Sequence, residues 1–258
     1  YRKYAKIILI QKSLTIFLGI SFFYAFGPAG IIFALVLTFV PHLVIFIKEF
    51  YNTKIDFALL KPRKNFIINN YFMRLSAGFG GQVDKLILAP LLGFSLLGNY
   101  SLALQIFTIL VIFSSIVFKY LLAQDASGIS NRNLKKITII VAIGISILGI
   151  LVLPKLIPLF FPKFIEAVDA IAIMSLAVVP EAISVLYSSK MLGKEKSKFV
   201  LAGKVLALSI LVIGFILLGP ILGIIGLAII FVVTATFQAC FLAITDKIEN
   251  GEQNVKQY

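Results

Sequence analysis

The chain has 258 residues, 60% of them hydrophobic, and a formal net charge of +13 from 24 lysines and arginines against 11 aspartates and glutamates. This hydrophobic share exceeds what a soluble domain needs to fill its core and is typical of a membrane protein. The basic surplus would suit a nucleic-acid-binding protein, but its placement along the chain argues against nucleic acid as a partner.

Apolar runs of about twenty residues recur along the chain, and each is long enough to cross the ~30 Å hydrocarbon core of a bilayer. We therefore predict an all-α polytopic membrane protein. The predicted transmembrane helices number about eight, at about 7–26, 29–48, 66–90, 97–121, 136–154, 166–188, 200–218 and 222–244.

The first two predicted helices, within 6–48, resemble the last two, within 198–244. The matching letters pair Lys6 with Lys198, Lys12 with Lys204, Gly27-Pro28 with Gly219-Pro220, and, after one inserted residue, Gly30 with Gly223. Both hairpins begin on the basic side, so the repeat would be parallel. We predict a complete six-helix lobe at 66–245, preceded at 1–50 by the final hairpin of an earlier lobe. The sequence would then be the C-terminal part of a longer protein.

The lysines and arginines set the predicted orientation. All except Arg74, Lys85, Lys155 and Lys163 fall on one side of the predicted membrane. By the positive-inside rule this side is cytoplasmic, which predicts a multi-pass protein of the cell membrane with both termini inside. The same surplus attracts anionic headgroups, so membrane lipids are an expected partner. A basic linker at 51–65 and a polar, disordered tail at 246–258 would both lie on this side.

The predicted helix at 66–90 carries more polarity than a purely structural membrane helix, because an ionisable group at mid-bilayer costs at least ~2.5–3.5 kcal/mol. At ~100° per residue, one arc of roughly 80° contains Asn70, Arg74, Gly78, Gly81 and Lys85. The pattern predicts one helix face on a polar cavity. The alternative is structural: Arg74 would pair with a neighbouring helix, and Lys85 would extend to the far interface.

Two other predicted helices carry polar groups. Gln105 lies in the helix at 97–121, and Glu181 follows Pro180 in the helix at 166–188. Counted at 1.5 Å per residue, Arg74 and Glu181 both lie roughly 12 Å from the cytoplasmic side and could meet. Between the fifth and sixth helices, Pro154, Pro158 and Pro162 recur at a spacing that argues against a regular helix and predicts an interfacial hinge.

Motifs for catalysis and cofactors are missing from the sequence. No GxxxxGK[ST] segment is present for nucleotide phosphates. One histidine, His42, and one cysteine, Cys240, cannot build a zinc site of the usual kind. We therefore expect no metal and no cofactor, and transport ranks above enzymatic activity.

The run GQVDKLILAPLLGFSLLGNYSLALQ (81–105) resembles the seventh-to-eighth helix signature of oligosaccharide flippases of the polysaccharide biosynthesis family. In that signature an acidic-basic pair, here Asp84-Lys85, precedes a glycine-containing segment, here Gly93, Gly98, Tyr100 and Ala103. MLGKEKSKF (191–199) and GIIGLA (223–228) resemble the tenth to twelfth helices. The family belongs to the multidrug/oligosaccharidyl-lipid/polysaccharide exporter superfamily.

The resemblance implies two six-helix lobes around a central cavity, and transfer of a polyprenyl-(pyro)phosphate-linked oligosaccharide from the cytoplasmic to the outer leaflet. Glycan-assembly membrane enzymes are then candidate partners. The resemblance does not fix the substrate-contacting residues, so we assign them from their polarity: Asn70, Arg74, Lys85 and Gln105 for substrate, with Asp84 and Glu181 as a coupling group or charge pair.

Two alternatives stay open. One is a cation-coupled small-molecule exporter of the same superfamily, which would use Asp84 or Glu181 as its coupling carboxylate. The other is a non-transporting membrane scaffold for glycan-assembly enzymes. The sign of the cavity separates the two transporters, because a phosphate-linked lipid requires cationic groups and a cation requires anionic ones.

Overall fold

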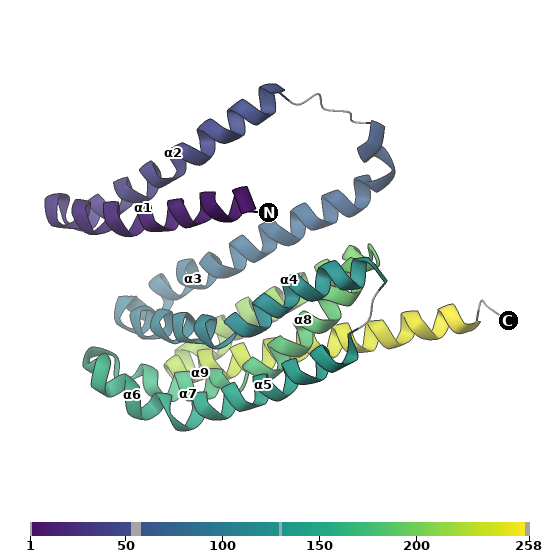
Figure 1. The fold of residues 1–258 in the computed structure, drawn as a ribbon. Helices are drawn as coiled ribbons and strands as arrows, with labels where there is room; N and C mark the ends of the chain where they lie inside the picture. Colours follow the sequence, from purple (N-terminus) through teal and green to yellow (C-terminus); the bar gives the residue numbers. More distant parts are fainter. Residues whose placement is uncertain (1, 53–57, 129–130, 256–258) are drawn as a thin grey trace. The chain divides into compact units, whose positions relative to one another are not determined.

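A computed structural model describes the backbone of residues 2–52, 58–128 and 131–255. Within these ranges it describes the side chains of 6–48, 50–51, 61–75, 85–128 and 131–249. The described residues form helices and no strand, which confirms the predicted all-α class (Figure 1). The chain divides into two compact units, Tyr1–Pro62 and Arg63–Tyr258. This division falls inside the predicted linker.

The first unit is a helical hairpin of α1 (Arg2–Phe26) and α2 (Pro28–Asn52), followed by the short helix η1 (Ala58–Arg63) at the boundary. Gly27 ends α1 with a positive φ of 64°, a conformation that residues with a Cβ rarely adopt. Gly30, three residues later, packs so closely that a Cβ there would lie 2.0 Å from the carbonyl oxygen of Phe22. Two glycines therefore make this tight turn.

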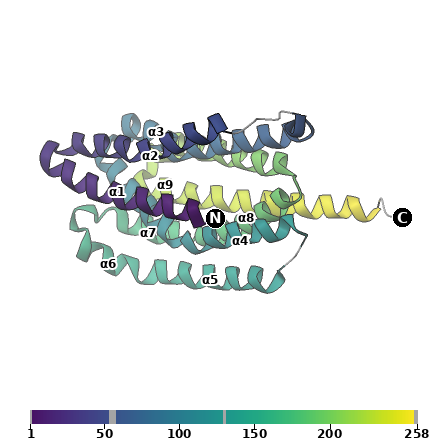
Figure 2. The same cartoon turned by 45° about the horizontal axis from the view of Figure 1, so that its top comes forward.

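The second unit contains the remaining elements, which run in chain order through α3 (Lys64–Leu110), α4 (Ile112–Ala126), α5 (Arg132–Leu151), α6 (Leu153–Phe160), η2 (Pro162–Phe164), α7 (Ala167–Ser175), α8 (Val178–Gly193) and α9 (Ser197–Val255). Two of these helices are broken inside. The φ of Gly93 in α3 is 83°, and that of Gly223 in α9 is 56°. Figures 1 and 2 show α4, α8 and α9 lying side by side.

The turn at Gly223 repeats the geometry of the turn at Gly27. Gly226 follows three residues later, and a Cβ there would lie 2.6 Å from the carbonyl oxygen of Leu218. The two turns therefore correspond as Gly27 to Gly223 and Gly30 to Gly226. The letter matches instead pair Gly27 with Gly219, so the geometric register differs from the sequence register by about one helical turn.

The main hydrophobic core lies at the end of the second unit where α3 and α9 bend. Tyr100 and Phe215 are fully buried and pack edge to face, with ring centroids 5.5 Å apart. Phe107 and Phe231 pack in the same way at 4.8 Å. Gly219 lets the two bends approach, because a Cβ there would lie 3.0 Å from Leu92. The core therefore fills one end of the second unit, and the cavity described below lies farther along the same helices.

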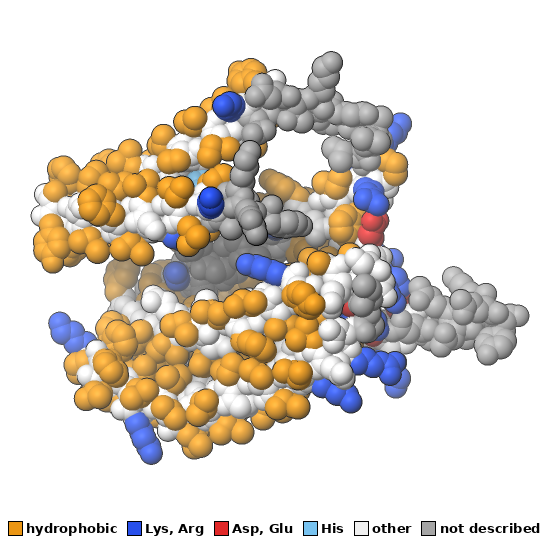
Figure 3. Space-filling model, viewed as in Figure 1, with side chains coloured by type: hydrophobic (Ala, Val, Ile, Leu, Met, Phe, Trp, Pro, Cys, Tyr) orange, Lys and Arg blue, Asp and Glu red, His pale blue; other side chains and the backbone are white. Residues whose placement is uncertain are grey.

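Five helices among the described residues are long and apolar enough to cross a membrane, or six if the pair α7–α8, bent by 43°, forms one span. The five ranges are Lys6–Phe26, Pro28–Lys48, Lys85–Leu110, Arg132–Leu151 and Ser197–Glu249. Hydrophobic side chains cover most of the visible flank of the second unit (Figure 3). Such an apolar surface is favourable against lipid tails, so the chain is a multi-pass membrane protein.

Two local expectations differ from the structure. The proline-rich segment is expected not to be helical, but it forms the short helix α6 with Pro158 inside it. Pro154 stands in the first turn, where no backbone N–H is needed, and the helix ends at Phe160 before Pro162. The polar tail is not disordered up to Val255, since α9 continues that far. Asp246 and Glu249 explain the continuation, because they pair with Lys190 and Lys196.

Candidate functional site

A cavity of about 380 Å³ lies within the second unit, between α3, α4, α8 and α9. Its length follows α8, from Glu181 in the first turn to Leu192 in the last, which corresponds to roughly 16 Å along the helix axis. Leu122, Leu192 and Val200 line it near the helix ends that carry the basic turn of 193–198, while its charged groups lie deeper.

Four charged side chains from four helix segments line the cavity. Arg74 comes from α3, Lys119 from α4, Lys204 from α9 and Glu181 from α8. Among the described lining residues, cations therefore outnumber carboxylates by three to one. An excess of positive charge beside low-dielectric walls concentrates anions.

Among the described residues, the cavity charges form no close ion pair. The four ion pairs formed by described residues, Arg63–Glu195, Lys135–Asp125, Lys190–Asp246 and Lys196–Glu249, include none of the four cavity groups. Glu181 and Lys204 lie on α8 and α9, which pack against each other. The structural alternative, a fixed ion pair of Arg74 with Glu181, is not formed.

Neutral polar groups complete the wall. Asn70 donates from Nδ2 to its own helix, at the carbonyl oxygen of Phe66, 2.8 Å away. Ser184 and Ser188 follow Glu181 by three and seven residues, on the same face of α8. The Oγ of Ser184 is buried and has no hydrogen-bond partner among the described residues. A buried hydroxyl without a partner is costly, so a ligand group in the cavity would gain from contacting it.

The bend between α7 and α8 brings Glu181 to the cavity. Pro180 has no N–H, so the carbonyl of Leu176 loses its partner in a regular helix and the chain bends there. Ser146 on α5 supports the bend, because its Oγ donates to the carbonyl oxygen of Ser175 at 2.9 Å. Glu181 then stands in the first turn of α8, past the bend and on the wall of the cavity that Lys204 also lines.

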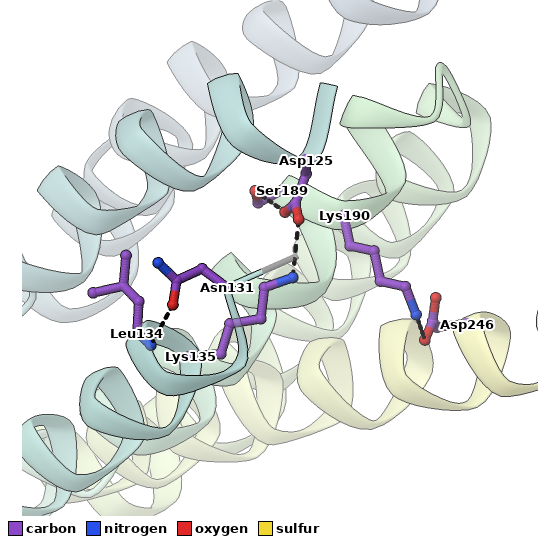
Figure 4. Close-up of polar contacts among 7 residues, drawn as sticks. All are labelled: Asp125, Asn131, Leu134, Lys135, Ser189, Lys190 and Asp246. Carbon is purple, nitrogen blue, oxygen red and sulfur yellow. Dashed lines mark hydrogen bonds and ion pairs between the residues drawn. The ribbon is translucent and has the colours of Figure 1, made fainter. Parts of the chain in front are cut away.

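A second cluster of charges holds the helix ends beyond the cavity (Figure 4). The carboxylate of Asp125, at the end of α4, accepts from Lys135 Nζ at 3.0 Å and from Ser189 Oγ at 2.7 Å. Lys190 donates to Asp246 at 2.6 Å. These contacts link α4, α5, α8 and α9. We call the group of Asp125, Lys135, Ser189, Lys190 and Asp246 the helix-end cluster.

Of the six site residues predicted from sequence, the structure brings Asn70, Arg74 and Glu181 to one cavity. Lys85 and Gln105 are not among the described residues that line it. Asp84, Gly78 and Gly81 lie in 76–84, whose backbone is described but whose side chains and surroundings are not.

Sequence reasoning missed Lys119 and Lys204 because it counted both among the cytoplasmic loop charges. Both lie seven residues inside their helices, from Ala126 at the end of α4 and from Ser197 at the start of α9. At 1.5 Å per residue this is roughly 10 Å, beyond the reach of an interfacial loop. Counting depth from the helix ends would have identified them.

The described residues contain no group of three or more histidine, cysteine, aspartate or glutamate side chains that could hold a metal ion. No protein-family model, curated protein or solved structure matches this chain.

Proposed function

We propose that this chain carries the substrate site of a membrane transporter for a lipid-linked anion, and that the substrate is a polyprenyl-(pyro)phosphate-linked oligosaccharide moved from the cytoplasmic to the outer leaflet. The observation that carries the proposal is the sign of the cavity. Arg74, Lys119 and Lys204 line it against the single described carboxylate of Glu181.

Each cation has a role that fits a phosphate group. A guanidinium stays charged in any environment and can hold two phosphate oxygens with parallel hydrogen bonds, which suits Arg74. Lys119 and Lys204 supply point charges from the other walls. The hydroxyl of Ser184 and the amide of Gln238 can bond to sugar or phosphate oxygens. The resemblance to oligosaccharide flippases supports the same substrate class.

The proposed topology has eight spans with both termini in the cytoplasm of a cell-membrane protein. The 53-residue stretch Ser197–Glu249 would extend for roughly 80 Å as one helix, more than twice the hydrocarbon thickness, and Gly223 breaks it. The break at Gly93 divides α3 in the same way. Single-cysteine labelling from outside, in a Cys240→Ser background, should reach position 155 and miss position 196.

A cation-coupled exporter is the second candidate, and Glu181 is the observation that favours it. A carboxylate on the cavity wall without a close ion pair could carry a proton or a metal cation. The three surrounding cations disfavour that use, because like charges repel a second cation. A non-transporting scaffold is less supported, since it gives the polar cavity no role.

Reconstitution of the full chain in vesicles tests the proposal, with transfer of a fluorescent polyprenyl-diphosphate sugar between leaflets as the readout. Arg74→Ala should abolish transfer while thermal unfolding changes little, and Arg74→Lys should restore part of it. Arg132→Ala, an exposed arginine at the start of α5, is the matched control and should transfer normally. Equal transfer by the Arg74→Ala and Arg132→Ala proteins would contradict the proposal.

A further inference from the structure

A cavity that binds a phosphate group must also release it. Three cations around about 380 Å³ in a low-dielectric wall would attract a phosphate strongly. Passage through a membrane requires binding favourable enough for entry and weak enough for exit. The cavity therefore needs a feature that limits its own affinity for the anion.

Glu181 has the position for that role. It lines the same cavity as the three cations, and its helix α8 packs against α9, which carries Lys204. The described ion pairs do not include either side chain, so the two share the cavity wall without an N–O contact of 4 Å or less. A lysine on a flexible stem can turn toward either of two nearby anions. Lys204 is thus placed to interact with Glu181 or with a substrate.

The pairing at the helix ends shows how the fold holds a lysine when the contact is structural. Lys135 contacts Asp125 directly, and Ser189 fixes the same carboxylate from a third helix. No comparable hydrogen bond to Glu181 is formed by the described residues, and its neighbour on the same face of α8, Ser184, keeps a hydroxyl without a partner. Glu181 and Lys204 are therefore arranged for exchange of partners.

We propose that Glu181 is an internal competitor for Lys204, a carboxylate that takes this lysine from the substrate phosphate and so promotes release. The inference rests on the proposed function and adds a specific role to one residue of the same site. In the substrate-bound cavity Lys204 faces the phosphate; between substrates it faces Glu181. Glu181 thereby sets the affinity for the anion and is a positioning residue that acts through Lys204.

This role differs from the two simpler roles for a membrane carboxylate. A coupling carboxylate binds a proton or cation, so its loss would remove the dependence of transport on that ion. A purely structural partner of Lys204 would, when lost, lower stability and leave anion affinity unchanged or reduced. A competitor gives the opposite result, since its removal strengthens anion binding.

Binding of inorganic pyrophosphate to the detergent-solubilised full chain, by calorimetry at fixed ionic strength, separates these roles. Glu181→Gln keeps the shape of the side chain and removes the competing charge, so pyrophosphate should bind about tenfold more tightly or better. Asp169→Asn, an exposed carboxylate on α7 outside the described cavity lining, is the matched control and should leave affinity unchanged.

The double variant Glu181→Gln with Lys204→Met gives a second test that remains available if the single variant does not fold, because it removes both charges together. Its pyrophosphate affinity should lie within about threefold of the wild-type value, since the pair contributes little net charge. In vesicles, Glu181→Gln should lower both KM and kcat for transfer, as expected when release becomes slower.

An unchanged or weaker affinity in Glu181→Gln, with wild-type binding intact, would overturn this inference and leave the proposed function standing. A double variant that loses affinity as severely as Arg74→Ala would also overturn it, because Lys204 would then be a required ligand without competition. A wild-type chain that does not bind pyrophosphate would contradict the proposed function and this inference together.

Discussion

The cavity and the helix-end cluster both contain lysines and carboxylates, and they differ in how these are paired. In the helix-end cluster Asp125 and Asp246 each contact a lysine directly. In the cavity three cations share one described carboxylate, with no contact among them close enough to count as an ion pair. The two regions lie on the same helices, since α4, α8 and α9 contribute to both.

The difference separates a structural use of charge from a binding use. Direct pairs satisfy each other, and breaking one leaves an uncompensated charge that destabilises the fold. Charges without close partners contribute little to the stability of the fold, yet they remain available to a ligand. Mutations in the helix-end cluster should therefore change stability, and those in the cavity should change anion binding.

Asp125→Asn is the change with the largest expected effect on stability. The Asp125 side chain is 6% exposed, so Lys135 would be left beside a buried neutral amide. The expected loss is about 3 kcal/mol in the free energy of unfolding, at the low end for buried pairs because Lys135 is 20% exposed. Denaturant unfolding in detergent measures it. A loss below about 1 kcal/mol would remove the structural role assigned to this cluster.

The structure also shows which parts of this comparison the sequence could predict. Helical arc and depth were enough to group Asn70, Arg74 and Glu181, because regular helices preserve spacing over a few turns. Lys119 and Lys204 were assigned to loops, since a basic letter near a predicted helix end suits either location. The pairs Lys135–Asp125 and Lys190–Asp246 join residues from different helices, and local periodicity carries no information about such contacts.

The positions of the turns could also be predicted from the sequence only in part. Hydropathy located the apolar runs of α9 correctly. The matching Lys, Gly and Pro residues, however, give the repeat a register that differs from that of the turns at Gly27 and Gly223. Both turns need a positive φ at one glycine and close backbone contact at a second. Several glycines near the turn satisfy a letter match, and only backbone geometry selects between them.

Gly193→Ala should have an intermediate effect. A Cβ at this position would lie 2.8 Å from backbone atoms of Asp125 and Ala126, which cannot move independently of α4. We expect a loss of about 1–3 kcal/mol in unfolding free energy, from the separation of α8 and α4 at the helix-end cluster. Gly144→Ala is the matched control, because nothing lies within 4 Å of its Cβ. Equal behaviour of the two variants would show that this close approach is not needed.

Arg63→Ala should have the smallest effect. Arg63 and Glu195 are 3.4 Å apart, but their side chains are 67% and 50% exposed. A pair so open to solvent contributes at most ~1 kcal/mol, and added salt should reduce that further. Unfolding at low and high salt measures the change. A salt-independent loss above about 2 kcal/mol would place this pair with the buried ones and weaken the comparison.

Ligand-induced stabilisation of the full chain tests most directly whether the cavity cations are available for an anionic ligand. Thermal unfolding of wild type and Arg74→Ala would be followed against rising inorganic pyrophosphate at constant ionic strength, with tetraethylammonium as the cationic comparison. We predict that pyrophosphate stabilises wild type, by about 2.7 kcal/mol at a hundredfold excess over Kd, and stabilises Arg74→Ala far less. Stabilisation of wild type by tetraethylammonium in place of pyrophosphate, or an equal response of both proteins to pyrophosphate, would contradict this prediction.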